Sequence, residues 1–177
     1  MRKILIIFLM LTDFSCNPYQ PYYFTHYHIT ARYDPGTTSL SSNVQMVLVA
    51  EKAYHDSIIF LLHGSFEILS LTAQELKYYE FENGRLALYI EEAVMPGDQL
   101  HISMSYKGKI GHGQDAGLAS DKYWYPVNRN IEKLTYSIEL GLPEKYRLEA
   151  PGTRKGQIWQ WGTTEPQGSI SVPIAVD

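Results

Sequence analysis

Cysteine is nearly absent from this sequence, and its scarcity excludes two classes of protein. The 177 residues contain a single cysteine, Cys16. One thiol cannot form an internal disulfide framework, and it cannot supply the paired thiolates of a cysteine-rich zinc module. Stability must therefore come from a hydrophobic core, which a chain of this length can build as a single domain.

Charge is also scarce, and its balance is slightly negative. Charged residues make up 19% of the chain, and 15 lysines and arginines stand against 19 aspartates and glutamates, for a formal net charge of -4. A general nucleic-acid-binding protein needs a basic surface to neutralise phosphates, so we expect no nucleic acid among the partners. Because 45% of the residues are hydrophobic, the composition is that of a folded chain and not of a disordered one.

Motifs that carry catalysis are missing as well. The sequence contains no H-E-x-x-H, no G-x-S-x-G, no P-loop and no dinucleotide-binding glycine fingerprint. His26 and His28 share one face of an expected strand, but no cysteine and no zinc-type spacing accompany them. Glu91 and Glu92 are adjacent, so on a strand they point to opposite faces and cannot act as an acid–base pair. We expect no catalytic residue, no metal ligand and no cofactor in this chain.

Helix signals are nearly absent, whereas strand signals recur every 8–12 residues or so. A β-rich run that stops at the turn signal 34–36 predicts a strand over 26–33. Alternating hydrophobic and polar residues predict strands over 100–106 and 134–140, and a further strand is expected over 169–174. The dipeptide Asn83-Gly84 lies between two β-rich runs and predicts a hairpin, since both residues of a type I′ turn need positive φ. The fold class is therefore all-β, an antiparallel β-sandwich or saddle of roughly ten strands.

Aromatic residues are abundant, and they leave a binding role open. They make up 13% of the chain, and 14 of them are tyrosines. Aromatic side chains favour strands and fill cores, which explains most of them without a ligand. Exposed rings on a sandwich can also stack on sugars or recognise peptides. The candidate ligand-stacking aromatics are Tyr123, Trp124, Tyr125, Trp159 and Trp161, and they leave a carbohydrate- or peptide-binding surface module as an alternative function.

The N-terminus has the pattern of an export signal. A short basic start precedes the apolar run 4–11, which is too short for the roughly 20 residues that span a bilayer. Ser15 then precedes Cys16, as in a bacterial lipoprotein signal, where the cysteine becomes the lipidated first residue. We predict a signal peptide over 1–15, a tether over 16–24 and one β domain over 25–177. The expected location is the bacterial cell envelope, with the membrane reached only through a lipid anchor.

Three segments together resemble the N-terminal domain of the aminopeptidase N family of zinc metallopeptidases. Residues 28–36 are similar to the first strand and turn of that domain. Residues 58–71 resemble its pattern of a strand ending in leucine and histidine, followed by a new strand. Residues 124–126 and 133–146 are similar to its stretch W-Y-P … K-x-T-Y-x-x-x-x-x-x-P-x-x-Y. The resemblance covers about residues 25–175, and it implies a β-sandwich or saddle-shaped β domain.

The resemblance also implies what this chain does not do. In the family, zinc and catalysis belong to a following domain that carries H-E-x-x-H, which is missing here. We therefore expect a non-catalytic module with a structural or binding role, and not an enzyme in its own right. The alternative is one piece of a split or truncated metalloaminopeptidase whose zinc domain is on another chain. The expected partners are a peptidase catalytic domain or partner chain, a peptide or a glycan.

The lipid anchor is directly testable. Mass spectrometry of the mature protein is expected to find Cys16 as its first residue, carrying lipid. The variant Cys16→Ser, which cannot accept a thioether-linked lipid, is expected to move from the membrane fraction to the soluble fraction. A Cys16→Ser protein that still fractionated with membranes would contradict the anchor.

Overall fold

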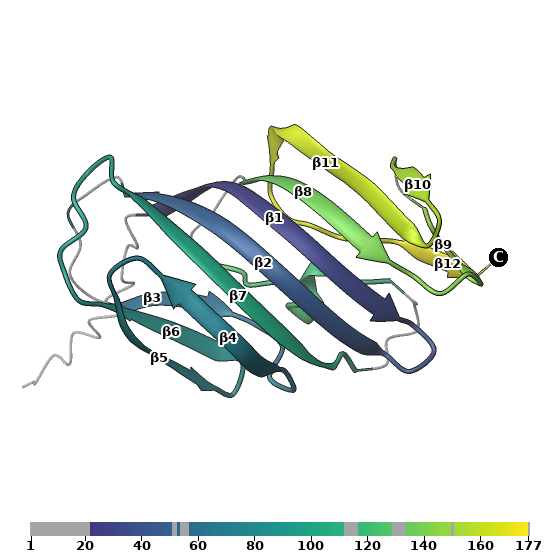
Figure 1. Cartoon of the computed structure of the whole chain (residues 1–177), viewed down its shortest axis with the longest axis horizontal. Coiled ribbons are helices and arrows are strands. Elements are labelled where there is room, and N and C mark those ends of the chain that lie inside the picture. Colours follow the sequence, from purple (N-terminus) through teal and green to yellow (C-terminus); the bar gives the residue numbers. More distant parts are fainter. Residues whose placement is uncertain are drawn as a thin grey trace, which may run out of the picture.

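A seven-stranded sheet forms one layer of the fold. The computed structural model describes residues 22–50, 53, 57–111, 117–128, 134–149 and 151–176, without the side chains of 22–25 and of Pro166. The order of the strands in the large sheet is β10-β11-β8-β1-β2-β7-β4 (Figure 1). Their bounds are β1 Tyr22–Asp34, β2 Ser39–Ala50, β4 Glu67–Ala73, β7 Gln99–Lys109, β8 Leu134–Gly141, β10 Thr153–Lys155 and β11 Ile158–Gln167.

Two smaller sheets form the second layer. One has the order β3-β6-β5, with bounds Ser57–Leu61, Arg85–Ile90 and Leu76–Glu82. The other pairs β12 (Ile174–Val176) with β9 (Tyr146–Leu148). Figure 1 places the three-stranded sheet toward the β4 end of the large sheet and the two-stranded sheet toward the β10 end. A 3-10 turn, η1 (Ser120–Lys122), lies in the segment between β7 and β8.

One strand pair in the large sheet is parallel. β1 pairs with β2 antiparallel on one side, and with β8 parallel on the other, from Tyr27 opposite Tyr136 to Arg32 opposite Gly141. A parallel pair needs a long crossover connection, and here the connection contains β2 to β7. The predicted all-β sandwich is therefore confirmed, and its large sheet is mixed.

Alternating side chains divide the large sheet into two faces. On β1, Tyr27 and Ile29 are buried while Thr30 and Arg32 are exposed. The same alternation continues on β2 and β7, because successive side chains of a strand point to opposite faces. One face therefore packs against the second layer to form the core. The opposite face, which we call the outer face, is open to solvent.

Trp124 closes the core from the segment between β7 and β8. Its side chain is 0% exposed, and its Nε1 donates to the Ile170 carbonyl over 3.2 Å. The hydroxyl of Tyr125 accepts from the backbone N–H of Ile170 over 3.0 Å. The two neighbouring aromatic residues therefore satisfy both backbone groups of one residue, in a region where an unpaired buried polar group would be costly.

Two more buried tyrosines fix the same segment from the large sheet. The hydroxyl of Tyr106, on β7, donates to the Trp124 carbonyl over 2.8 Å. The hydroxyl of Tyr27, on β1, donates to the Pro126 carbonyl over 2.8 Å. Burial raises the pKa of both phenols, so they stay protonated and able to donate. These hydroxyls tie a segment with little regular structure to the centre of the sheet.

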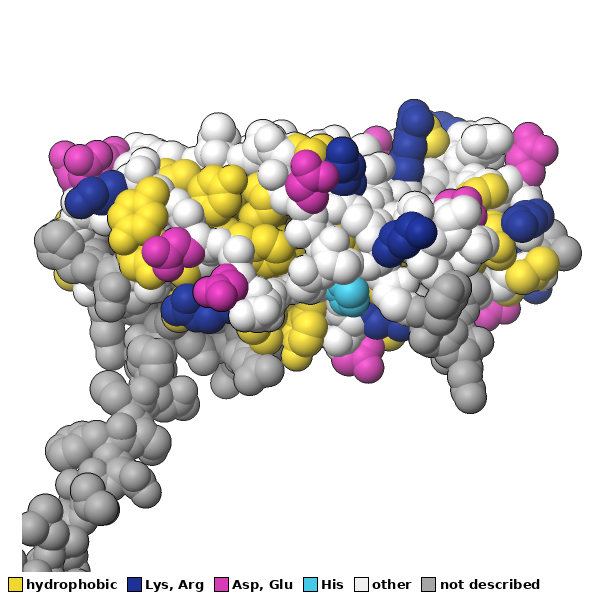
Figure 2. Space-filling view, turned by 90° about the horizontal axis from the view of Figure 1, so that it is seen from below, with side chains coloured by type: hydrophobic (Ala, Val, Ile, Leu, Met, Phe, Trp, Pro, Cys, Tyr) yellow, Lys and Arg dark blue, Asp and Glu magenta, His cyan; other side chains and the backbone are white. Residues whose placement is uncertain are grey.

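The sandwich is open on the side where β4 and β5 form the edges. Inward-facing Leu71, Leu76 and Phe81 remain partly exposed there, Leu69 is 51% exposed and Tyr79 is 40% exposed. Figure 2 shows hydrophobic side chains gathered in a patch with acidic side chains beside it. We call Leu69, Leu71, Leu76, Tyr79 and Phe81 the β4–β5 seam. Large apolar patches on a soluble protein commonly mark interaction sites.

Several expectations about local structure can now be compared with the fold. The Asn83-Gly84 hairpin is confirmed, with φ of 51° and 79°. The strand expected over 169–174 was wrong: the strand begins only at Ile174, and Val172 makes a single bridge. β1 begins at Tyr22, inside the segment expected to be a tether. Cys16 and the expected signal peptide lie outside the described residues. No helix in the described ranges is long and apolar enough to cross a membrane.

The core position of Trp124 predicts a large loss of stability on truncation. Trp124→Ala is expected to lower the free energy of unfolding by about 3–5 kcal/mol, because it leaves a cavity and removes a hydrogen bond. Urea denaturation followed by circular dichroism measures this loss. Leu69→Ala, at an exposed position, is the control and should change stability by less than about 1 kcal/mol. A loss below about 1 kcal/mol for Trp124→Ala would contradict the assigned core.

Candidate functional site

The outer face of the large sheet carries two hollows lined by polar side chains. One row across it joins Gly141 of β8, Arg32 of β1, Ser41 of β2, Lys107 of β7 and Glu67 of β4. The rows beyond it carry hydroxyl, amide and imidazole groups, together with the carboxylate of Glu139 beside Thr30. Members of these rows are Thr30, Asn43, Ser105, Ser137, His28, Gln45 and Ser103. A face with this chemistry can bind a ligand by hydrogen bonds and charge, without stacking.

A histidine network joins β1 to β8 on this face. His26 Nδ1 lies 3.0 Å from the Thr135 hydroxyl, and His26 Nε2 lies 3.2 Å from the Ser137 hydroxyl. The same Ser137 hydroxyl lies 2.8 Å from His28 Nδ1. Two proton arrangements satisfy all three contacts with a neutral His26. In one, Thr135 donates to His26, His26 donates to Ser137 and Ser137 donates to His28, and in the other each donor and acceptor is exchanged. The network therefore fits a neutral His26 and leaves Nε2 of His28 for solvent or a ligand.

The electrostatics favour the same neutral form. Burial, and then the charge of His28, lower the pKa of His26 below its ordinary value of 6.5. Protonating both His26 and His28 would also place two positive charges on one face of β1. His26 therefore acts as a neutral hydrogen-bonding group near neutral pH.

A metal site does not form from these histidines. His26 and His28 line a hollow of about 510 Å³ on the outer face, and His101, on β7, lines it as well. Val47 separates His101 from His26 in the row across the sheet, so about 10 Å separates the two strands. Among the described residues, no group of three histidine, cysteine, aspartate or glutamate side chains could hold a metal ion. His112, which could have added a ligand, lies outside the described residues.

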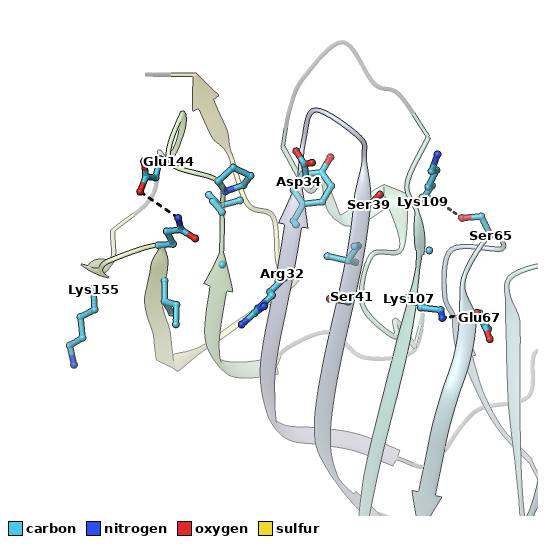
Figure 3. A pocket seen from close by; sticks show the side chains of 18 residues that line it. Arg32, Asp34, Ser39, Ser41, Ser65, Glu67, Lys107, Lys109, Glu144 and Lys155 are labelled. Atoms are coloured by element: carbon cyan, nitrogen blue, oxygen red, sulfur yellow. Dashed lines mark hydrogen bonds and ion pairs between the residues drawn. The ribbon is translucent and has the colours of Figure 1, made fainter.

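A larger groove crosses the outer face near the end of β1 and the start of β2. It encloses about 1340 Å³, and Figure 3 shows the side chains that line it. Lys107 Nζ pairs with Glu67 Oε2 at 3.4 Å on one wall. Asp34 accepts from the backbone N–H of Gly36 over 2.9 Å and from the Thr37 hydroxyl over 3.0 Å. Arg32 lies between these groups and carries a full charge into the groove.

Two of the candidate stacking aromatics lie in the core. Trp124 is 0% exposed and Tyr125 is 1% exposed, so neither offers a free ring face to a ligand in this structure. Tyr123 ends the η1 turn in the left-handed region, with φ of 50°, and its side chain is partly exposed.

The two other candidates lie on β11, on the core side of the large sheet. Trp159 is opposite Leu140 and Trp161 is opposite Ile138, both of which are core residues. Both indoles are partly exposed, and the Arg154 guanidinium lies 5.5 Å from the centre of the Trp159 ring. The five aromatic residues therefore do not form one row on a common surface.

The groove residues were missed by sequence reasoning. Alternation on β1 places Arg32 on the polar face, but nothing local says which strands lie beside it. Lys107 is 75 positions later, and Gly141 is more than 100 positions later, so their proximity depends on the strand order.

Comparisons with known proteins give a likeness of fold alone. No protein-family model and no curated protein matches the sequence. The M1 zinc metallopeptidase from Deinococcus radiodurans, in a mutant bound to a Tyr-Ser-Ala substrate, superposes with a TM-score of 0.72 at 12% identity. The match covers 88% of this chain and 42% of the peptidase chain. The unmutated peptidase gives a TM-score of 0.70 over the same shares, also at 12% identity.

A second match has the same character. A two-domain M1 zinc metallopeptidase mutant bound to L-arginine superposes with a TM-score of 0.63 at 13% identity, over 86% of this chain and 40% of its own. This chain thus spans about two fifths of the length of the peptidases that it matches. The resemblance to the aminopeptidase N group is confirmed at the level of fold: the described structure has the fold of one part of an M1 zinc metallopeptidase.

The histidine network predicts a pH effect with a definite sign. The folded pKa of His26 lies below the unfolded value of 6.5, so the unfolded chain takes up this proton more readily. Stability from this group is therefore complete above pH 6.5 and is lost as the pH falls below it. An NMR titration should place the His26 midpoint below 6.5.

The matching variant is His26→Gln, which keeps a polar side chain but cannot titrate. It should reduce the stability that the protein loses between about pH 7.5 and about pH 5, measured by urea denaturation. A midpoint at or above 6.5, or an unchanged loss of stability in the variant, would contradict the assignment.

Proposed function

We propose that this chain is a non-catalytic β module, exported to the cell envelope, that works with a zinc peptidase domain located outside the described residues. The observation that carries the proposal is the likeness of fold, which covers 88% of this chain but 42% of an M1 zinc metallopeptidase. The motif H-E-x-x-H is missing from the sequence. The remaining share of such a peptidase would then lie on another chain or in another part of a longer one.

The β4–β5 seam is the surface that we assign to the zinc domain. Leu69, Leu71, Leu76, Tyr79 and Phe81 expose apolar surface along two neighbouring edge strands. Burying such a surface against another domain would remove it from water, at about 25 cal/mol per Å² of apolar area. A partner seated there also covers backbone groups of both edge strands, which are otherwise open to unwanted pairing.

Charge around the seam favours a partner with a basic rim. The exposed side chains of Glu75, Glu80 and Glu82 lie on β5 or in the turn before it, together with the single cation Lys77. Acidic groups at the rim of an apolar surface steer a partner of opposite charge and select its orientation. The zinc domain is thus proposed to present an apolar surface flanked by lysines or arginines.

Export and lipidation complete the proposal. The apolar run 4–11 and the Ser15-Cys16 pair support a lipoprotein signal. A lipid on Cys16 would hold the module at a membrane surface, and the peptidase partner would be held there with it.

The partner and the lack of activity are tested together. Tagged chain, purified from the envelope of its source cells, is expected to bring down a polypeptide that contains H-E-x-x-H, identified by mass spectrometry. Leu69→Glu should abolish this capture, because it places a charge in the seam. Val176→Glu is the matched control, since Val176 is an exposed apolar residue of β12, away from the seam, and should leave capture unchanged.

Activity gives the second readout. The purified chain is expected to release no amino acid from aminopeptidase substrates, with or without added zinc. Metal-dependent release by the chain alone would overturn the non-catalytic assignment. Repeated purification without any H-E-x-x-H polypeptide would overturn the partnership.

A further inference from the structure

The outer-face groove is locally cationic in an acidic chain. Its lining holds the cations Arg32, Lys107, Lys109 and Lys155, and the acids Asp34, Glu67 and Glu144. The whole chain has a formal charge of -4. The groove therefore departs in sign from the rest of the molecule, and such a local field attracts anions.

The acids of the groove are engaged, whereas most of its cations are not. Glu67 forms an ion pair with Lys107. Asp34 accepts hydrogen bonds from the Gly36 N–H and the Thr37 hydroxyl, within the turn that follows β1. Glu144 accepts a hydrogen bond from Gln157 Nε2 over 3.5 Å. Within the part of the chain that the structure describes, no acidic side chain lies within ion-pair distance of Arg32, Lys109 or Lys155. Four cations thus stand against three acids in the lining, and Arg32, Lys109 and Lys155 are the cations that a ligand can reach.

Arg32 lies in the middle of the charged groups that line the groove (Figure 3). Its neighbours across the sheet are Gly141, which has no side chain, and Ser41, which has a small one. A Cβ at Gly141 would lie 3.2 Å from Arg32 Cγ, so the arginine stem runs across the glycine. Figure 3 shows Arg32 in the middle of the groove, with Glu144 and Lys155 on one side and the Lys107–Glu67 pair on the other. A planar guanidinium in this position can bind a carboxylate through two parallel hydrogen bonds.

The other lining groups indicate which anion fits. Ile158 is 44% exposed and lies beside Gly141, so an apolar contact is available next to Arg32. Among the described residues of the lining, Tyr33 is the one aromatic residue and is 4% exposed, so these residues offer sugar rings no surface on which to stack. The groove crosses all seven strands of the large sheet, and the gaps between them, at about 4.8 Å each, add up to about 29 Å, the length of about eight extended residues.

We propose that this groove binds an extended acidic peptide, whose carboxylates pair with Arg32 and Lys109 and whose apolar side chain contacts Ile158. This site is separate from the β4–β5 seam. Binding there needs no zinc domain, so failure of this proposal would leave the proposed partnership unaffected.

The test measures binding of defined probes to the full chain. The probe is a fluorescein-labelled peptide of about eight residues that alternates glutamate with leucine and serine, and its binding is followed by fluorescence anisotropy. Arg32→Gln is expected to raise Kd roughly tenfold, and Lys109→Gln about threefold, as for charge-assisted hydrogen bonds. Lys77→Gln, on β5 and outside the groove, is the matched control and should change Kd by less than about twofold. Circular dichroism checks that each variant is folded.

Further arms decide the chemistry of the ligand. The same peptide with glutamine in place of glutamate should bind at least about tenfold more weakly. Raising the salt from about 50 to about 200 mM should weaken binding of the acidic peptide. Oligogalacturonate, an acidic glycan, should not compete. The proposal would be overturned if the acidic peptide did not bind, or if the glutamine peptide bound as tightly as the acidic one. It would also be overturned if Lys77→Gln raised Kd as much as Arg32→Gln, or if the glycan bound more tightly than the peptide.

Discussion

The parallel pairing of β1 with β8 is the interaction on which the rest of the structure depends. It joins one block of the large sheet, β1, β2, β7 and β4, to the other block, β8, β11 and β10. Without it the inner faces of the two blocks would not form one continuous wall for the core. The same pairing brings Arg32 beside Gly141 and His28 beside Ser137. The groove and the histidine network therefore both extend across the β1–β8 pair.

Buried tyrosines explain how a two-layer fold includes a long segment with little regular structure. A chain without sheet partners leaves carbonyl groups to be satisfied, and burying them unpaired is costly. Tyr27 and Tyr106 reach from the large sheet to the Pro126 and Trp124 carbonyls, and Trp124 itself reaches the Ile170 carbonyl. The richness in tyrosine thus reflects a need for large apolar side chains that end in a hydrogen-bonding group.

Local chemistry made much of the fold predictable. The Asn83-Gly84 turn requires positive φ at two positions, and alternation marks β7 and β8 without any knowledge of their neighbours. The parallel pair was not predictable, because Tyr27 and Tyr136 are 109 residues apart and no local pattern encodes their contact. The candidate site depends on that contact. Sequence reasoning therefore found the aromatic residues 123–125, which are close in sequence, and missed Arg32 and Lys109, which meet only in the folded sheet.

β8 is synthesised long after β1, and this delay affects how the chain folds as it is made. β1 ends at Asp34, and its parallel partner begins at Leu134. At synthesis rates of about 5–20 residues per second, roughly 5–20 s pass between the two. During that interval β1 and β2 can pair, but the other edge of β1, which pairs with β8 in the finished fold, leaves its backbone N–H and C=O groups unpaired. The nascent chain thus passes through a stage in which its central strand is an edge strand, and this is the stage at which a chaperone has most to protect.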